Sequence, residues 1–236
     1  MTDLASLSWP ELAERAAGSI LAVPVGSTEQ HGPHLPLATD TLLAGALAEG
    51  LAGCRPDVLV APALPYGSSG EHAGFPGTLS IGREALELVV LELVRSADAF
   101  AGVVLVSGHG GNADPLDRAA RTATAEGRSV LVWAPRAASL AGLGDRPPDG
   151  HAGWVETSIL LDLAPGTVRS SRAEAGNPRP LAELAGELRT GGVAAVSPNG
   201  VLGDPAGAGP ELGRACLEAL LADLAATVAA RFGEPR

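Results

Sequence analysis

The sequence is poor in cysteine and in aromatic residues, and its charge balance lies well on the acidic side. Its two cysteines, Cys54 and Cys216, are far apart and form no Cys-x-x-Cys or Cys/His spacing. This argues against a thiolate metal site and predicts buried free thiols. The net charge of -11 repels phosphate backbones and anionic lipid surfaces. We therefore predict no nucleic-acid partner and no membrane partner.

The N-terminal stretch carries acidic residues and has no uninterrupted apolar core. It is predicted to be neither a signal peptide nor a membrane span, and a cytoplasmic location is expected. With 46% apolar and 18% charged residues, the composition is that of a folded globular protein. The length of 236 residues fits one domain, and we predict a single domain over residues 1–236.

Short apolar runs that end in small residues alternate with longer segments of helical periodicity. The apolar runs cover residues 19–27, 58–70, 101–108 and 128–136, and the helical patterns cover residues 41–53, 83–100, 114–127, 151–165 and 210–232. This alternation predicts an α/β protein, a three-layer α/β/α sandwich with a mostly parallel central sheet. The glycine-rich residues 191–209 predict a short hairpin or an ordered loop.

Polar side chains gather where the predicted strands end. Glu29 and His31 follow the first strand, His72 the second and His109 the third, and His151 precedes a later helix. Because sites in parallel sheets form at the carboxyl ends of the strands, we expect these groups to converge.

The residue types at these strand ends point to a metal site. Glu29 and His31 are two residues apart, so in an extended segment both side chains leave the same side of the backbone. Asp40 stands at the start of a predicted helix, where its alternative role is an N-cap. His109 lies among glycines that leave room around the imidazole. Together these groups form a nitrogen and oxygen ligand set that suits Zn, Mn or Fe(II).

Four segments, in this order, resemble the creatininase family of metal-dependent amidohydrolases: GSTEQHGPHLPLATDT, GSSGEHAGFPGTLSIG, SGHGGN and HAGWVETS. Residues 175–208 resemble in particular the mycofactocin-system peptidase branch of that family. The resemblance implies a creatininase-like fold, a homo-oligomer and a hydrolase that cuts amide bonds. In this branch the substrate is a radical-modified precursor peptide, which is cut near its C-terminus to release the core derived from Val and Tyr.

The resemblance also implies roles for single residues. The family metal ligands match Glu29, His31, Asp40 and His109, which would hold two divalent ions (Zn, Fe(II) or Mn). Asp40 would bridge the two ions. Creatininase proper has a further carboxylate ligand two residues after the His109 counterpart, where this chain has Gly111. Glu156 is expected to fill that place and to take part in catalysis, and its alternative role is a helix first-turn residue favoured by the dipole.

His151 resembles the proton-donating histidine of the family. It is therefore the expected general acid for the leaving nitrogen, since imidazole titrates near neutral pH. The residues expected to contact substrate lie in or beside the same loops: His72, Tyr66, Phe75, Trp133 and Trp154. For His72 the alternative is a supporting contact to a metal ligand, and for the aromatic residues it is core packing.

Two other activities stay open. GHGGNA, residues 108–113, also fits the dinucleotide fingerprint G-x-G-x-x-A between a strand and a helix. That interpretation predicts an NAD(P)-dependent oxidoreductase but gives no role to Glu29, His31 and Asp40. The other activity is a deformylase or another hydrolase of small cyclic or linear amides within the same family, because bond choice depends on pocket shape.

Overall fold

The centre of the fold is a parallel β-sheet. The computed structural model describes residues 3–144 and 147–235. Within these residues, four parallel strands form one sheet in the order β2-β1-β3-β4. The strands are β1 (Ile20–Val25), β2 (Val58–Val60), β3 (Gly102–Ser107) and β4 (Val130–Trp133). The register of β1 and β3 runs from Ile20 opposite Gly102 to Val25 opposite Ser107. The loops that follow these two central strands therefore emerge at the same end of the sheet.

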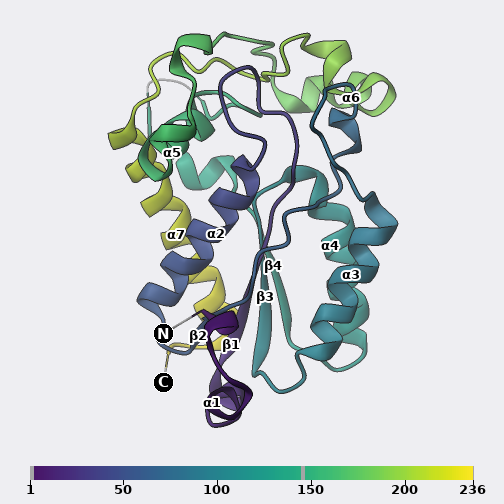
Figure 1. The fold of residues 1–236 in the computed structure, drawn as a ribbon, viewed down its shortest axis with the longest axis vertical. Helices are drawn as coiled ribbons and strands as arrows, with labels where there is room; N and C mark the ends of the chain where they lie inside the picture. The colour runs from purple at the N-terminus through teal and green to yellow at the C-terminus, as the bar shows by residue number, and fades with distance from the viewer. Residues whose placement is uncertain (1–2, 145–146, 236) are drawn as a thin grey trace.

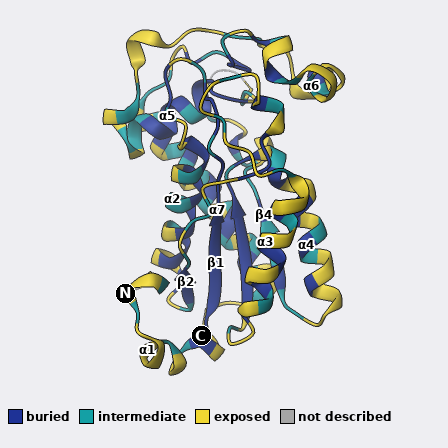
Figure 2. Cartoon of the chain, turned by 45° about the vertical axis from the view of Figure 1, so that its right-hand side comes forward, coloured by how far each residue is buried: buried dark blue, intermediate teal, exposed yellow. Residues whose placement is uncertain are grey.

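Helices cover both faces of the sheet (Figure 1). On one side lie α2 (Thr39–Cys54), α5 (Trp154–Leu163) and α7 (Pro210–Phe232), and on the other lie α3 (Arg83–Ser96) and α4 (Ala113–Ala125). Along β1, Ile20 and Ala22 pack into the first core, whereas Leu21 and Val23 pack into the second. The strands run through the buried centre of the molecule (Figure 2). This confirms the predicted three-layer α/β/α fold with a parallel sheet.

The remaining helices lie outside these layers. Helix α1 (Trp9–Ala13) begins with a capping box between Ser8 and Glu11. Helix α6 (Leu181–Val196) lies beyond the carboxyl ends of the strands (Figure 1). It is kinked at Gly192, where φ is 68°. The prediction of a hairpin or loop from residue 191 is therefore wrong for residues 191–196. Short 3₁₀ helices are η1 (Leu4–Ser6), η2 (Ala16–Gly18), η3 (Gly70–His72), η4 (Gly110–Asn112), η5 (Ala137–Leu140), η6 (Pro165–Thr167) and η7 (Ser170–Arg172).

The C-terminal helix α7 packs on the core through one stripe, which includes Cys216, Leu220 and Leu224. Cys216 is buried as predicted, but Cys54 is exposed at the end of α2, so the prediction of a buried thiol is wrong there. Across the described residues, no helix combines the length and apolar character needed to cross a membrane.

Candidate metal centre

Five acidic and histidine side chains converge at the carboxyl ends of β1 and β3. The loop after β1 carries Glu29 and His31, and α2 carries Asp40 in its first turn. His109 directly precedes η4, and Glu156 lies in the first turn of α5. Glu29 and His31 are 0% exposed, Asp40 is 1% exposed and His109 is 7% exposed. Four of the five groups are therefore buried, which strengthens the interactions among their charges.

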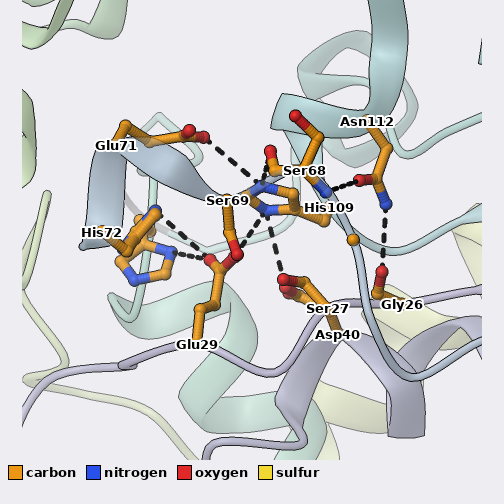
Figure 3. A network of polar contacts seen from close by, with 12 residues as sticks. Gly26, Ser27, Glu29, Asp40, Ser68, Ser69, Glu71, His72, His109 and Asn112 are labelled. Carbon is orange, nitrogen blue, oxygen red and sulfur yellow. Dashed lines mark hydrogen bonds and ion pairs between the residues drawn. The ribbon is translucent and has the colours of Figure 1, made fainter. Parts of the chain in front are cut away.

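Imidazole nitrogens and carboxylate oxygens in this cluster lie within a few ångströms of one another. Nε2 of His31 lies 3.1 Å from Oδ1 of Asp40 and 3.8 Å from Oε2 of Glu156. Nδ1 of His109 lies 3.1 Å from Oε2 of Glu29 and 3.5 Å from Oδ2 of Asp40. Figure 3 shows His109 with Glu29 and Asp40 around it. Asp40 thus turns one oxygen toward each histidine, which is the placement that a bridging carboxylate requires.

The carboxylates of the cluster fit a cation. Both oxygens of Glu29 and Oδ2 of Asp40 are buried and accept no hydrogen bond from the part of the chain that the structure describes. Glu29, His31 and Asp40 form one group whose ligand atoms all lie within 4.8 Å of one another, and His31, His151 and Glu156 form a second. Buried charges are retained when they are paired or coordinate a metal. The donor set of oxygen and imidazole nitrogen therefore suits a divalent cation.

Gln30 links a further histidine to the cluster. Its Oε1 accepts the N–H of Gly32 at 2.8 Å, which fixes the orientation of the amide. Its Nε2 then directs two hydrogens to O of Gly200 at 3.0 Å and to Nδ1 of His72 at 2.8 Å. His72 therefore carries its proton on Nε2, which lies 3.2 Å from Oε1 of Glu29. Glu29, His72 and His151 form a third group within 4.8 Å. With this tautomer, however, Nε2 of His72 carries a hydrogen beside Glu29 and offers no electron pair to a metal.

His151 has one ring nitrogen free to act in the cluster. Its Nε2 donates to O of Gln30 at 2.9 Å, and its Nδ1 lies 3.9 Å from Oε1 of Glu29. The ring centroid lies 4.3 Å from that of His31. The backbone of His151 pairs with Leu202 in both directions. The loop around residue 202 therefore holds this imidazole in place.

The cluster shifts the pKa values of its members in opposite directions. Burial raises the pKa of Glu29, but the surrounding histidines outweigh burial and hold that pKa well below the usual range. Burial lowers the pKa of His31, but Asp40 and the other carboxylates raise it to about 10. His109 behaves in the same way, and its pKa lies well above the ordinary value. Without a cation, these imidazoles are held as positively charged partners of the carboxylates.

The pKa values of Glu156 and His151 are shifted in the directions that favour their uncharged forms. Burial, assisted by Asp40, raises the pKa of Glu156 to about 7, although His31 opposes this shift. Burial, together with the nearby imidazoles of His31 and His72, lowers the pKa of His151 well below its ordinary value. His151 is therefore a neutral imidazole at pH 7.

Asp40 and Glu156 each had an alternative structural role in the sequence. The residue at the N-cap of α2 is Ala38, so Asp40 is not the cap and its side chain faces the histidines instead. Glu156 combines both of its roles, because Oε2 accepts the N–H of Ala152 at 2.6 Å while lying 3.8 Å from Nε2 of His31.

The aromatic residues expected to contact substrate divide into two groups. Trp133 and Trp154 are buried core residues. Their indole N–H groups donate to Oδ2 of Asp223 at 2.7 Å and to O of Pro147 at 3.1 Å. Both rings therefore pack in the core, which was the alternative for them, and a contact with substrate stays a prediction. Tyr66 is 46% exposed, and Phe75 packs on the small cluster formed mainly by α6, so both stay predictions.

Sequence reasoning missed Glu71 and Gln30, although both contact residues that it singled out. Oε1 of Glu71 lies 3.3 Å from Nε2 of His109, and Gln30 contacts His72 and His151. Each missed residue stands next to a candidate in the sequence. That adjacency was the available signal, since neighbouring side chains in turns can face the same site.

A cavity of about 280 Å³ adjoins the cluster and includes His109, Gly110, Arg136, Glu156 and Leu181 in its lining. This volume is close to the lower limit of small-molecule sites and suits a side chain or the end of a peptide. The dinucleotide interpretation fits this region less well. A Cβ at Gly108 would lie 2.2 Å from O of Asp40, so contact with α2 accounts for that glycine without a bound pyrophosphate.

Comparison with known proteins agrees with the fold. The family model described as creatinine amidohydrolase matches residues 5–228. The chain is 47% identical over 231 residues to the mycofactocin precursor peptide peptidase of Mycobacterium ulcerans, covering 94% of this chain and 86% of that protein. It is 31% identical over 191 residues to the creatinine amidohydrolase of Pseudomonas putida, covering 70% and 73% of the two chains. A solved structure described as creatininase with Mn superposes with a TM-score of 0.84 at 27% identity and covers 98% of each chain. The chain therefore belongs to the creatininase family.

Proposed function

We propose that this protein is a metal-dependent amidohydrolase that cleaves a radical-modified mycofactocin precursor peptide near its C-terminus and releases the core derived from Val and Tyr. The observation that carries the proposal is the buried cluster of Glu29, His31, Asp40 and His109. Both oxygens of Glu29 and Oδ2 of Asp40 in this cluster have no hydrogen-bond partner in the described chain. The substrate is inferred from relatives that are 46% to 49% identical and are named for this peptide.

In this proposal, two divalent ions, Zn, Mn or Fe(II), are held by Glu29, His31, Asp40, His109 and Glu156. When bound, such ions polarise the amide carbonyl and lower the pKa of water. The two oxygens of Asp40 face His31 and His109 separately, which supports a shared role for this carboxylate. Glu156 supplies the carboxylate that Gly111 cannot supply.

His151 moves the proton in this reaction. Its Nε2–H is engaged by O of Gln30, so the free electron pair of Nδ1 faces the cluster. A neutral imidazole accepts the proton that the attacking water loses and then delivers it from Nδ1 to the leaving nitrogen of the amide. A low pKa favours the second transfer, because an amine binds a proton more strongly than this imidazole does.

The proposal is tested by incubating the protein with modified and unmodified precursor peptide and weighing the products by mass spectrometry. Protein loaded with Mn or Zn is expected to cut the modified peptide, and protein treated with chelator is expected to regain this activity only when the metal is returned. Full cleavage in excess chelator, or no cleavage of either peptide by loaded protein, would contradict the proposal.

A matched pair of variants separates the site from general effects on the fold. Glu29→Gln removes a buried carboxylate of the cluster and is expected to lose bound metal and cleavage together. Glu49→Gln changes an exposed carboxylate on α2 and is expected to keep both. The homo-oligomer implied by the family stays a prediction, which light scattering of the purified protein tests directly.

A further inference from the structure

Glu71 lies outside the predicted ligand set, yet it holds one of the proposed ligands. It belongs to η3, in the loop that follows β2, and its side chain is about one third exposed. Its Oε1 lies 3.3 Å from Nε2 of His109, and O of Ser68 lies 3.3 Å from the same nitrogen. Figure 3 shows this contact together with those that His109 makes to Glu29 and Asp40. The two ring nitrogens of His109 therefore face different partners.

The contact between Glu71 and His109 depends on a glycine. A Cβ at Gly111 would lie 2.4 Å from Nε2 of His109, 2.5 Å from Oε1 of Glu71 and 2.5 Å from O of Ser68. Real Cβ atoms do not approach other atoms so closely, so any side chain at residue 111 would separate the three groups. The neighbouring Gly110 has nothing within 4 Å of the equivalent position. The requirement for glycine is therefore local to residue 111.

The backbone of Glu71 is also fixed from the other side. A Cβ at Gly192 would lie 2.6 Å from O of Glu71, and Gly192 has a φ of +68° at the kink of α6. The kinked helix therefore packs directly on the backbone of η3. This packing limits how far Glu71 can move away from His109.

We propose that Glu71 is a positioning residue for the metal centre, and that Gly111 provides the space for it. Glu71 and O of Ser68 accept the Nε2–H of His109, which fixes the ring orientation and leaves the electron pair of Nδ1 directed at Glu29 and Asp40. A carboxylate that holds the second nitrogen of a ligating histidine orients the ring and makes it a better electron donor. The inference rests on the proposed metal site.

A cavity of about 640 Å³ beside Glu71, which Ser68, Arg83, Gly111 and Arg189 also line, suggests a rival role. There Glu71 would contact substrate and leave the metal unaffected. Metal affinity measured without substrate separates the two roles, because only a positioning residue changes it.

The experiment measures Zn affinity of metal-free protein by competition with a chromophoric chelator. Glu71→Ala is expected to weaken binding by about 10- to 100-fold, the usual effect of losing such a partner. Glu71→Gln keeps an acceptor oxygen and a similar shape, so it is expected to lose less affinity than Glu71→Ala. Turnover of Glu71→Ala is expected to recover at saturating Zn, which a role in substrate binding would not produce.

Matched controls show whether the effect belongs to this contact. Gly111→Ala is expected to weaken Zn binding, whereas Gly110→Ala and Glu49→Gln are expected to bind as the parent does. Zn affinity of Glu71→Ala within twofold of the parent would overturn the inference. If Glu71→Ala does not fold in a thermal melt, Glu71→Gln with unchanged affinity and unchanged turnover at limiting Zn overturns it. Failure of the parent itself to bind Zn would instead refute the proposed function.

Discussion

Replacing Glu156 with glutamine is expected to abolish the pH dependence of proton release when the cluster binds a divalent cation. A carboxylate must lose its proton before it can bind a metal. The pKa of Glu156 is raised to about 7 by burial and by Asp40. With this pKa, about 0.9 of a proton occupies the carboxylate at pH 6 and about 0.1 at pH 8.

The pKa values of the histidines in the cluster are shifted away from the ordinary value of imidazole. His31 and His109 have raised pKa values and carry a proton at both pH values, whereas the lowered pKa values of His72 and His151 favour their neutral forms. Glu156 is therefore expected to contribute most of the difference between pH 6 and pH 8, about 0.8 of a proton per cation bound beside it.

Isothermal titration calorimetry of Mn binding in buffers of different ionisation enthalpy measures the protons released. The parent is expected to release more protons at pH 6 than at pH 8, and Glu156→Gln is expected to release the same number at both. Glutamine still offers an oxygen to the N–H of Ala152, so the start of α5 is preserved. An identical difference between the two pH values in parent and variant would show that Glu156 is not a ligand.

Four further substitutions test other parts of the account. His151→Ala is expected to keep bound metal, measured by elemental analysis, while its turnover falls at least about 100-fold because the proton carrier is lost; parent-like turnover would contradict that role. Gly108→Ala places a Cβ against the backbone of α2 and is expected to lower the free energy of unfolding by about 1–3 kcal/mol. A Cβ at Gly110 would meet open space, so Gly110→Ala is expected to change the free energy of unfolding by less than about 0.5 kcal/mol. Urea titration measures both variants. Trp133→Phe loses its hydrogen bond to Asp223 and is expected to lower the free energy of unfolding by about 1–3 kcal/mol. KM for the peptide is expected to stay unchanged, and a raised KM would indicate that Trp133 contacts substrate.

The fold was largely predictable because its elements repeat a strong pattern. Fully apolar strands followed by amphipathic helices, such as β3 and α4, have few alternatives to a parallel sheet with covered faces. The end of α6 was not predictable from its pattern. Gly191 and Gly192 look like a loop in sequence, whereas in the structure the backbone leaves the helical conformation at Gly192, where α6 is kinked and packs against η3.

The candidate site was predictable where spacing or position in the fold brings residues together. Glu29 and His31 are two residues apart, and the register of β1 and β3 places His109 beside them. Glu71 has no such pattern, because its position depends on the approach of η3 to His109 across Gly111. Contacts of this kind arise from tertiary packing and leave no periodic signal in the sequence.

Anomalous X-ray scattering from crystals of the Mn-loaded protein tests the central claim most directly. We predict anomalous peaks among Glu29, His31, Asp40 and His109, with Asp40 in contact with more than one peak. Protein that binds Mn in solution but shows no anomalous density among these side chains would contradict the account.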